Sequence, residues 1–196
     1  MTELRLECVA DYVCFYQKNI SDFIQLKLLV YKAEIWKLAC AKTMLLTTVL
    51  FFKADWCHQF VVCTDIIAVD RPGKLYRFTV LYYLLSVIYN TRFVIYVQLR
   101  SLQAIFSVSM LYSAAKWGER EIWDLFGILF LAHPDLRRLL TDYGFNRFPL
   151  RKDFPITGYT ELFFSDTLKS IIYTKVEIAQ DVRISSILAP WSLKKR

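Results

Sequence analysis

The stretch that decides the fold runs from residue 60 to residue 99 and reads FVVCTDIIAVDRPGKLYRFTVLYYLLSVIYNTRFVIYVQL. Three runs within it are rich in β-branched and aromatic residues and therefore favour β-strands. They cover Phe60 to Val69, Tyr76 to Ser86 and Arg92 to Leu99. Asp70-Arg71-Pro72-Gly73 makes a turn between the first two runs, and Tyr89-Asn90-Thr91 makes the second turn. Strands joined by such short links pair antiparallel, so this stretch predicts an antiparallel sheet.

The segments before this stretch predict helices that cover the sheet. Leu4 to Tyr16 favours a first helix, and the partial alternation from Phe23 to Tyr31 favours a strand. From Ala33 to Phe52 the period changes, because several apolar residues fall on one helical face: Ile35, Leu38, Leu45, Val49 and Phe52. We therefore expect one long helix over 33–52. Helices on one face of a mostly antiparallel sheet define an α+β fold.

The segments after the stretch predict a further helix and then an extended region. Ser113 to Phe126 has helical spacing, and Gly127 suits the residue that ends such a helix. Pro134 is well placed at the first position of a second, short helix. Beyond Gly144 the periodicity is weak and prolines recur. We therefore expect an α+β domain over 1–160 and an extended C-terminal tail over 161–196 that packs on partner subunits.

The composition indicates a protein that is covered by other proteins. Of its 196 residues, 56% are apolar, above the roughly 45–50% of an ordinary soluble domain. The best apolar run, Thr43 to Phe52, is flanked by lysines and is half the length that a bilayer-spanning helix needs, about 20 residues. An obligate subunit has apolar surface of this kind, because its interfaces resemble a domain core cut in half.

The charge and the ligand-forming residues exclude several classes of function. The net charge of +7 would suit an anionic partner, but the basic residues are dispersed among acids and no nucleic-acid-binding motif accompanies them. The five cysteines include no CxxC pair, and neither histidine has a second ligand at helical spacing. We therefore expect no nucleic acid, no metal and no cofactor in this chain. The acidic start, MTELRLE, resembles neither a secretory signal nor a transit peptide.

Charges, tryptophans and glycines are most densely mixed between residues 117 and 153. One interpretation makes Glu119, Glu121, Asp124 or His133 an acid–base group of a stand-alone enzyme, which would need a substrate pocket and a shifted pKa. The other interpretation is a half-buried network that fixes the geometry of an interface, with aromatic and arginine residues as its anchors. The residues predicted for such a network are Trp117, Glu119, Arg120, Glu121, Trp123, Asp124, His133, Asp135, Arg137, Arg138, Asp142, Arg151, Lys152 and Asp153.

The same region carries a resemblance to a known family. The motifs are WGEREIWDLFGI at 117–128, HPDLRR at 133–138, TDYGF at 141–145 and PLRKDFP at 149–155, with VDRP at 69–72 and NTR at 90–92 upstream. Their order and spacing resemble subunit 9 of NADH dehydrogenase, also called NADH dehydrogenase iron–sulfur protein 3, of respiratory complex I. The resemblance extends over about residues 60–162. The chain departs from the family at Arg147-Phe148, where Gly-His is usual.

The resemblance implies a non-catalytic structural subunit of the peripheral arm of NADH:ubiquinone oxidoreductase. Such a subunit supports the quinone-site subunit and the iron–sulfur subunits, while FMN, iron–sulfur clusters and ubiquinone are bound by other subunits. It implies a place on the matrix side of the mitochondrial inner membrane, with membrane association only through the complex. The alternatives are the equivalent subunit of a related membrane-bound hydrogenase-type complex and an enzyme that uses the cluster from Glu119 to Asp142.

Overall fold

The computed structural model describes residues 27–30, 35–178, 180 and 183. The chain divides into two compact units, Met1–Phe154 and Pro155–Arg196, and each is described by itself. No helix among the described residues combines the length and apolarity needed to cross a bilayer. The helix expected at 4–16, and the parts of the first expected strand at 23–26 and 31, lie outside the described residues.

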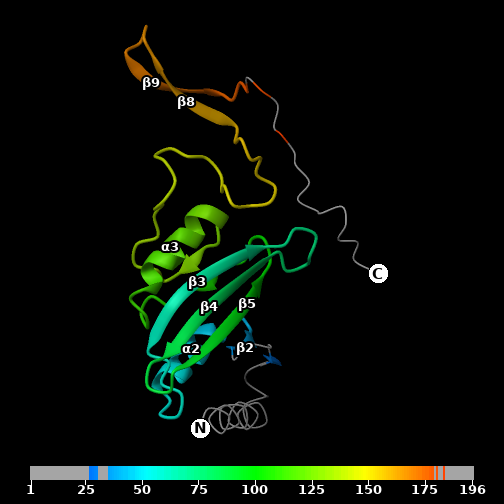
Figure 1. The fold of residues 1–196 in the computed structure, drawn as a ribbon, viewed down its shortest axis with the longest axis vertical. Helices are drawn as coiled ribbons and strands as arrows, with labels where there is room; N and C mark the ends of the chain where they lie inside the picture. The colour runs from blue at the N-terminus through cyan, green and yellow to red at the C-terminus, as the bar shows by residue number, and fades with distance from the viewer. Residues whose placement is uncertain (1–26, 31–34, 179, 181–182, 184–196) are drawn as a thin grey trace. The chain divides into compact units, whose positions relative to one another are not determined.

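A five-stranded sheet organises the first unit, and its strand order is β1-β2-β5-β4-β3 (Figure 1). Its members are β1 (Lys27–Val30), β2 (Ile35–Cys40), β3 (Val62–Asp70), β4 (Phe78–Ser86) and β5 (Thr91–Leu99). Only the pair β2–β5 is parallel, and the other three pairs are antiparallel. The α+β fold with a mostly antiparallel sheet is therefore confirmed, as are the three strands expected between residues 60 and 99.

Alternation along the strands places one face of the sheet in the core. In β4, the residues Phe78, Val80, Tyr82 and Leu84 are buried in this core, and β5 contributes every second residue from Phe93 to Leu99. Two helices pack on the same core, α2 (Leu45–Ala54) and α3 (Ala115–Phe126). This is the period-2 pattern of a sheet with one face against helices.

The long helix expected over 33–52 is wrong, because its first part is strand β2. The backbone of Ile35 to Cys40 pairs with β1 on one side and β5 on the other, so two ladders of hydrogen bonds outweigh the helical spacing of the apolar residues. Helix α2 begins only after the turn at 42–44. The hydroxyls of Thr47 and Thr48 donate to the carbonyl of Met44, at 2.9 and 2.7 Å, so the hydrogen-bonding groups of these two β-branched residues have a partner within the helix.

Helix α3 ends as the sequence predicts. Gly127 follows Phe126 in the left-handed region, with φ of 71°, and its N–H donates to the carbonyl of Trp123 at 2.9 Å. A second glycine lets the helix approach the sheet, because a Cβ placed on Gly118 would lie 3.3 Å from the Cβ of Ile66 in β3. A two-stranded parallel sheet of β6 (Ile105–Phe106) and β7 (Phe130–Leu131) flanks α3 in the sequence.

The short helix expected at Pro134 is wrong. No helix or strand forms between Ala132 and Tyr159. The reason lies in the hydrogen bonds of this loop, because three of its backbone N–H groups, those of residues 139–141, donate to a side chain of α3 rather than to carbonyls of their own segment.

The second unit contains a β-hairpin of β8 (Thr160–Ser165) and β9 (Ser170–Lys175). The register places Leu162 opposite Tyr173 and Phe164 opposite Ile171, so these four apolar side chains share one face. Each of them is between 45% and 68% exposed. The sequence predicted an extended tail here and gave no sign of this hairpin.

Candidate functional site

Helix α3 carries the two buried carboxylates at the centre of the predicted network. Glu119 and Asp124 are both 0% exposed. They are five residues apart, so they leave the helix in directions about 140° apart. Glu119 meets the segment after β6, and Asp124 meets the loop at 138–141. The two carboxylates therefore belong to separate sites on different sides of the helix, with Glu119 nearer its N-terminal end and Asp124 nearer its C-terminal end.

Asp124 holds the loop at 138–141 by five hydrogen bonds. Its Oδ2 accepts the backbone N–H groups of Leu139, Leu140 and Thr141 at 3.2, 2.8 and 2.8 Å. Its Oδ1 accepts the hydroxyl of Thr141 at 2.6 Å and an N–H of Arg138 at 3.0 Å. Burial alone raises the pKa of Asp124, but the hydrogen bonds from Thr141, Leu140 and Leu139 outweigh it and leave the pKa at about 2. Asp124 is therefore an ionised anchor.

Glu119 has far fewer donors. Its Oε1 accepts the N–H of Val108 at 2.8 Å, and its Oε2 accepts the hydroxyl of Ser107 at 2.5 Å. Burial raises the pKa of Glu119 to about 7, against the lowering effect of these two hydrogen bonds. The hydroxyl of Ser107 also lies 2.7 Å from that of Ser109, so a protonated Glu119 can donate to Ser107 while Ser107 donates to Ser109.

His133 lies beside Glu119 but is held by backbone groups. Its Nδ1 accepts the N–H of Asp135 at 3.1 Å, so the ring proton sits on Nε2. That Nε2 lies 3.3 Å from the carbonyl of Lys116 and 3.8 Å from Oε2 of Glu119. The arrangement is that of a residue that fixes a turn, because both ring nitrogens contact the backbone.

Arg120 also binds backbone. Its guanidinium donates to the carbonyls of Arg137 and Arg138, at 3.3 and 3.5 Å, and lies over the ring of Trp117 at 5.2 Å. Arg120 is 9% exposed, whereas Trp117 is 61% exposed. The ring of Trp117 thus presents one face to the arginine and leaves much of its surface to solvent.

A third cluster closes the C-terminal end of α3. Arg151 donates to the carbonyls of Phe126 and Gly127, at 2.6 and 3.5 Å, where a cation also complements the negative end of the helix dipole. Its guanidinium lies over the rings of Phe78 and Phe148, at 5.4 and 4.5 Å. A Cβ placed on Gly127 would lie 2.4 Å from the ring of Phe148. Glycine is therefore required here by space as well as by φ.

A fourth cluster fastens the segment at 151–154 to the end of β3. Arg77 donates to both carboxylate oxygens of Asp70, at 2.7 and 2.8 Å, and to Asp153 at 2.9 Å. The backbone N–H of Lys152 donates to Asp70 at 2.9 Å. The hydrogen bond from Arg77 holds the pKa of Asp70 below its usual range.

The residues predicted to form one network belong to several separate sites, and the structure adds residues that the sequence did not predict. Glu121 is exposed and forms no ion pair with a described residue, and Asp142 is exposed and accepts the N–H of its neighbour Tyr143 at 2.8 Å. Asp135 and Arg137 pair with each other at the surface, at 2.9 Å. Trp123 is half-buried, with its ring 5.8 Å from that of Phe148. The sequence did not predict four residues that complete these sites: Asp70, Arg77, Ser107 and Phe148.

Opposite charges on either side of a predicted turn, Asp70 at its start and Arg77 early in the strand that follows, were the available signal for this pair. A serine among apolar residues, as at 107, gives no such signal, because only the fold brings it to Glu119. Phe148 gives no such signal either, because its partners Gly127 and Arg138 are 21 and 10 residues away in the sequence, and only the fold brings them to its ring.

The geometry of these sites favours structure over chemistry. Glu119 and Asp124 are covered completely by protein atoms, so neither touches a space that a substrate could occupy. Among the described residues, no group of three or more His, Cys, Asp or Glu side chains could hold a metal ion. The polar side chains of the motif bond mainly to backbone groups of the same chain, so they fix the shape of a surface.

The fold and these sites thus define a protein of structural type, in which a charged motif shapes a surface. The family model described as "Respiratory-chain NADH dehydrogenase, 30 Kd subunit" matches residues 38–160. The chain belongs to this family: it is a subunit of the peripheral arm of complex I, of the type that holds no cofactor and no catalytic site itself.

Relatives of known name agree with the family. NADH-ubiquinone oxidoreductase subunit 9 of Prototheca wickerhamii is 46% identical over 141 residues, which are 72% of this chain and 73% of that protein. The same subunit of Acanthamoeba castellanii is 47% identical over 68% of this chain and 67% of that protein. A bacterial relative, one of the subunits of the NADH-quinone oxidoreductase of Paramagnetospirillum magneticum, is 46% identical over 72% of this chain and 71% of that protein.

Two solved structures share the fold. A trypsin-resistant fragment of Nqo5 superposes with a TM-score of 0.55 and 25% identity, over 67% of this chain and 99% of the fragment. A chain of an archaeal membrane-bound sulfane sulfur reductase superposes with a TM-score of 0.61 and 20% identity, over 74% of this chain and 86% of that chain.

Proposed function

We propose that this chain is a scaffold that joins the quinone-site subunit of complex I to its neighbouring iron–sulfur subunits. The observation that carries the proposal is the internal satisfaction of the charged motif. Asp124, Arg120 and Arg151 each bind backbone carbonyl or N–H groups of this chain, and thereby hold the irregular segment 132–154 in one shape. A surface built from loops needs such bonds if it is to fit a partner without ordering itself on binding.

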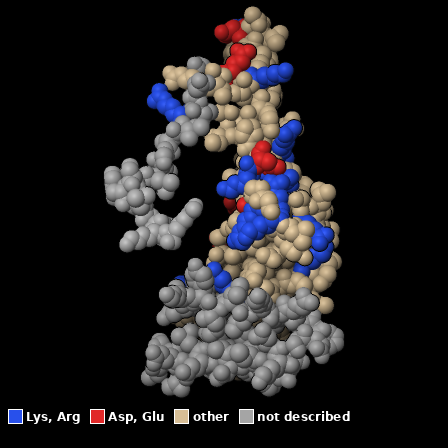
Figure 2. All heavy atoms as spheres, turned by 90° about the vertical axis from the view of Figure 1, so that its right-hand side faces the viewer, with Lys and Arg blue, Asp and Glu red and all other residues tan. Residues whose placement is uncertain are grey.

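Exposed apolar side chains support a role inside an assembly. In the first unit, large apolar side chains that are more than 60% exposed include Leu75, Val87, Ile88, Leu102, Met110 and Trp117. On the face drawn in Figure 2, uncharged side chains cover most of the described surface, and Lys and Arg gather with a few acids between them. Protein neighbours would remove this apolar surface from water, which is the main favourable term in most associations.

The tail at 161–196 has the role of packing on partner subunits in this proposal. An isolated two-stranded hairpin is at best marginally stable in water, and β8–β9 exposes apolar side chains such as Phe164 and Ile171. A neighbour that covers the face of Leu162, Phe164, Ile171 and Tyr173 would supply the missing burial.

The proposal places FMN, the iron–sulfur clusters and ubiquinone in other subunits, and places this chain on the matrix side of the mitochondrial inner membrane. The relatives named subunit 9, from Prototheca wickerhamii and Acanthamoeba castellanii, support a mitochondrial origin. The equivalent subunit of a membrane-bound hydrogenase-type complex is less well supported, because the sulfane sulfur reductase chain shares only the fold at 20% identity. A stand-alone enzyme is disfavoured by the complete burial of Glu119 and Asp124.

The test is native electrophoresis of detergent-solubilised mitochondrial membranes, with an in-gel stain for NADH dehydrogenase activity and mass spectrometry for this chain. We expect the chain in the large active band. Its migration only as a small free species would overturn the proposal. A second readout is the isolated chain, which we expect to be poorly soluble.

A further inference from the structure

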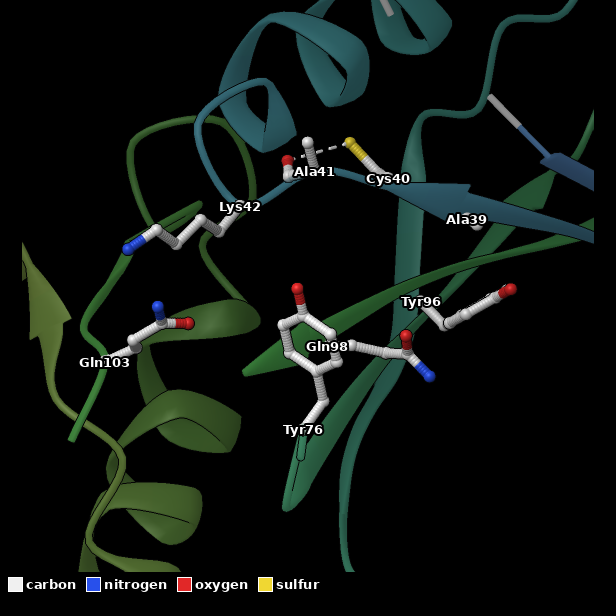
Figure 3. A pocket seen from close by; sticks show the side chains of 8 residues that line it. All are labelled: Ala39, Cys40, Ala41, Lys42, Tyr76, Tyr96, Gln98 and Gln103. Carbon is white, nitrogen blue, oxygen red and sulfur yellow. Dashed lines mark hydrogen bonds between the residues drawn. The ribbon is translucent and has the colours of Figure 1, made fainter. Parts of the chain in front are cut away.

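A hollow on the first unit shares none of its lining residues with the sites of Glu119, Asp124, Arg151 and Arg77. Its volume is about 330 Å³. It is lined by residues at the end of β2 and just after it, by two residues of β5, and by Tyr76 and Gln103 (Figure 3). The two β5 residues, Tyr96 and Gln98, alternate with the core residues Ile95, Val97 and Leu99, so they lie on the sheet face that points away from the core.

The side chains of this hollow are rich in hydrogen-bond donors and include one cation. Lys42 forms no hydrogen bond or ion pair with a described residue, and in Figure 3 its ammonium group lies on the same side of the hollow as the amide of Gln103. The Oε1 of Gln103 accepts the N–H of Arg100 at 3.1 Å, which leaves its NH₂ group as a donor. Gln98 offers a second amide, and Tyr76 and Tyr96 offer hydroxyls.

Among the described residues that line the hollow, Lys42 carries a positive charge and none carries a carboxylate. The guanidinium of Arg100 adds a second positive charge, because it lies over the ring of Tyr76 at 5.7 Å from the ring centre. A cationic or purely apolar ligand would face this charge without compensation, whereas a carboxylate would accept charge-assisted hydrogen bonds from Lys42 and from the amide of Gln103 beside it (Figure 3).

We propose that this hollow receives an aspartate or glutamate side chain of a neighbouring subunit, with Lys42 as its ion-pair partner. The inference rests on the scaffold function, because it needs a neighbour. The net charge of +7 favours a protein carboxylate, because it calls for acidic surfaces on the proteins that surround this chain.

The experiment is zero-length crosslinking of the intact complex with a carbodiimide. The reagent activates a carboxylate, and a lysine amine within contact distance then forms an amide with it while the reagent leaves as its urea. We expect a crosslinked peptide that joins Lys42 to an aspartate or glutamate of another subunit. The matched control is Lys42→Arg, which keeps the positive charge but does not form this amide, so the complex should assemble and that peptide should vanish.

A charge reversal gives a second, independent readout. Lys42→Glu should lower the amount of assembled complex roughly fivefold or more, since it places two like charges together in a buried contact. Lys74→Glu is the control, because Lys74 lies in the exposed turn between β3 and β4, and it should leave assembly unchanged.

Four results would overturn the inference. The first is normal assembly of the complex with Lys42→Glu, and the second is a crosslink of Lys42 only to this same chain. The third is a Lys42 that reacts with an amine reagent in the complex as fast as Lys74 does. The fourth is a Lys42 that is protected from the reagent but forms no crosslink, which would indicate a small anion or a lipid. If the chain is absent from the complex altogether, the scaffold function itself fails, and the first electrophoresis experiment separates that case.

Discussion

The two ends of helix α3 hold carboxylates that are both 0% exposed and that behave in opposite ways. Asp124 receives five hydrogen bonds, including one from a guanidinium, and its pKa is about 2. Glu119 receives two, from Val108 and Ser107, and its pKa is about 7. Lack of solvent exposure therefore does not decide the charge of a carboxylate. Its depth and its donors decide it together, because desolvation dominates at the more deeply placed Glu119, whereas hydrogen bonds to the charged form outweigh desolvation at Asp124.

The difference in pKa indicates that the two ends of α3 have different structural roles. The C-terminal end, with Asp124, Gly127 and Arg151, uses charge and close contact to fix a long loop that has no helix or strand. The end with Glu119 joins α3 to the segment after β6 through a group that is close to its titration point at neutral pH. The first end should therefore be sensitive to mutation at all ordinary pH values, and the second should be sensitive to pH.

The largest effect is expected from Asp124→Ala. The substitution leaves Arg138 and three backbone N–H groups without their partner, so the free energy of unfolding should fall by about 3–5 kcal/mol. Urea unfolding of the full chain in mild detergent measures this. The control Asp142→Ala removes an exposed carboxylate that accepts one N–H, and should cost less than about 1 kcal/mol. Equal losses in the two variants would mean that Asp124 is not an anchor.

The next effect is expected from Gly127→Ala, at about 2–5 kcal/mol. The left-handed backbone conformation at Gly127, with φ of 71°, costs a side chain about 1–2 kcal/mol, and overlap with the ring of Phe148 adds about 1–3 kcal/mol. Gly73→Ala is the matched control, because Gly73 has φ of 88° but open space around its Cβ position. The same unfolding experiment on both variants isolates the overlap, and no difference between them would refute the close packing of Phe148.

Glu119→Gln should change the pH dependence of stability by about 3 kcal/mol. The pKa of Glu119 is raised from 4.5 to about 7, so the native state binds the proton more tightly than the unfolded state does. The stability that this proton supplies is complete below about pH 4.5 and is lost as the pH rises through about 7. Glutamine resembles the protonated form. The variant should match the parent chain near pH 4.5 and be more stable by about 3 kcal/mol at pH 8.

Urea unfolding of both chains across that pH range tests the expectation. Identical pH profiles for the parent and the Glu119→Gln variant would show that Glu119 is not the titrating group. The result would also remove the contrast with Asp124, whose contribution is present at all pH values above about 4 and is lost only as the pH falls through about 2.

The sequence predicted the elements that rest on local signals and failed where distant partners decide. The strands at 62–70, 78–86 and 91–99 and the helix that ends at Gly127 follow from alternation, turns and a C-terminal glycine. The helix expected over 33–52 was wrong because Ile35 to Cys40 pair in parallel with β5, whose residues are 57 positions further along the chain (Ile35 pairs with Arg92). The helix expected at Pro134 was wrong because Asp124 takes the N–H groups that such a helix would need.

The charged motif shows the same limit. Its composition predicts buried polar residues near α3, but not which donors meet which carboxylate. Asp124 and Glu119 look alike in the sequence. The lowered pKa of Asp124 depends on hydrogen bonds from the segment at Thr141, and the raised pKa of Glu119 depends on its burial, and only the fold supplies either. Pairings between side chains are set by tertiary structure, so a single sequence cannot rank them.

The smallest effects are expected from Arg138→Ala and Glu121→Ala, and they separate loop shape from direct contact. Arg138 is about one-third exposed and donates to Asp124 and to the carbonyl of Arg147, so its loss should lower the free energy of unfolding by about 1–2 kcal/mol. Glu121 is exposed, and Glu121→Ala should change the free energy of unfolding by less than about 0.5 kcal/mol. In the complex, both should lower the amount assembled more than the turnover of each assembled complex.

Comparison of the two variants by native electrophoresis then sharpens the contrast between the ends of α3. Arg138→Ala acts through the loop that Asp124 holds, so Arg138→Lys should restore part of the assembly. Glu121→Ala can act only through a neighbour, because Glu121 forms no ion pair with a described residue. Normal assembly with lost turnover in either variant would instead require that residue to take part in electron or proton transfer.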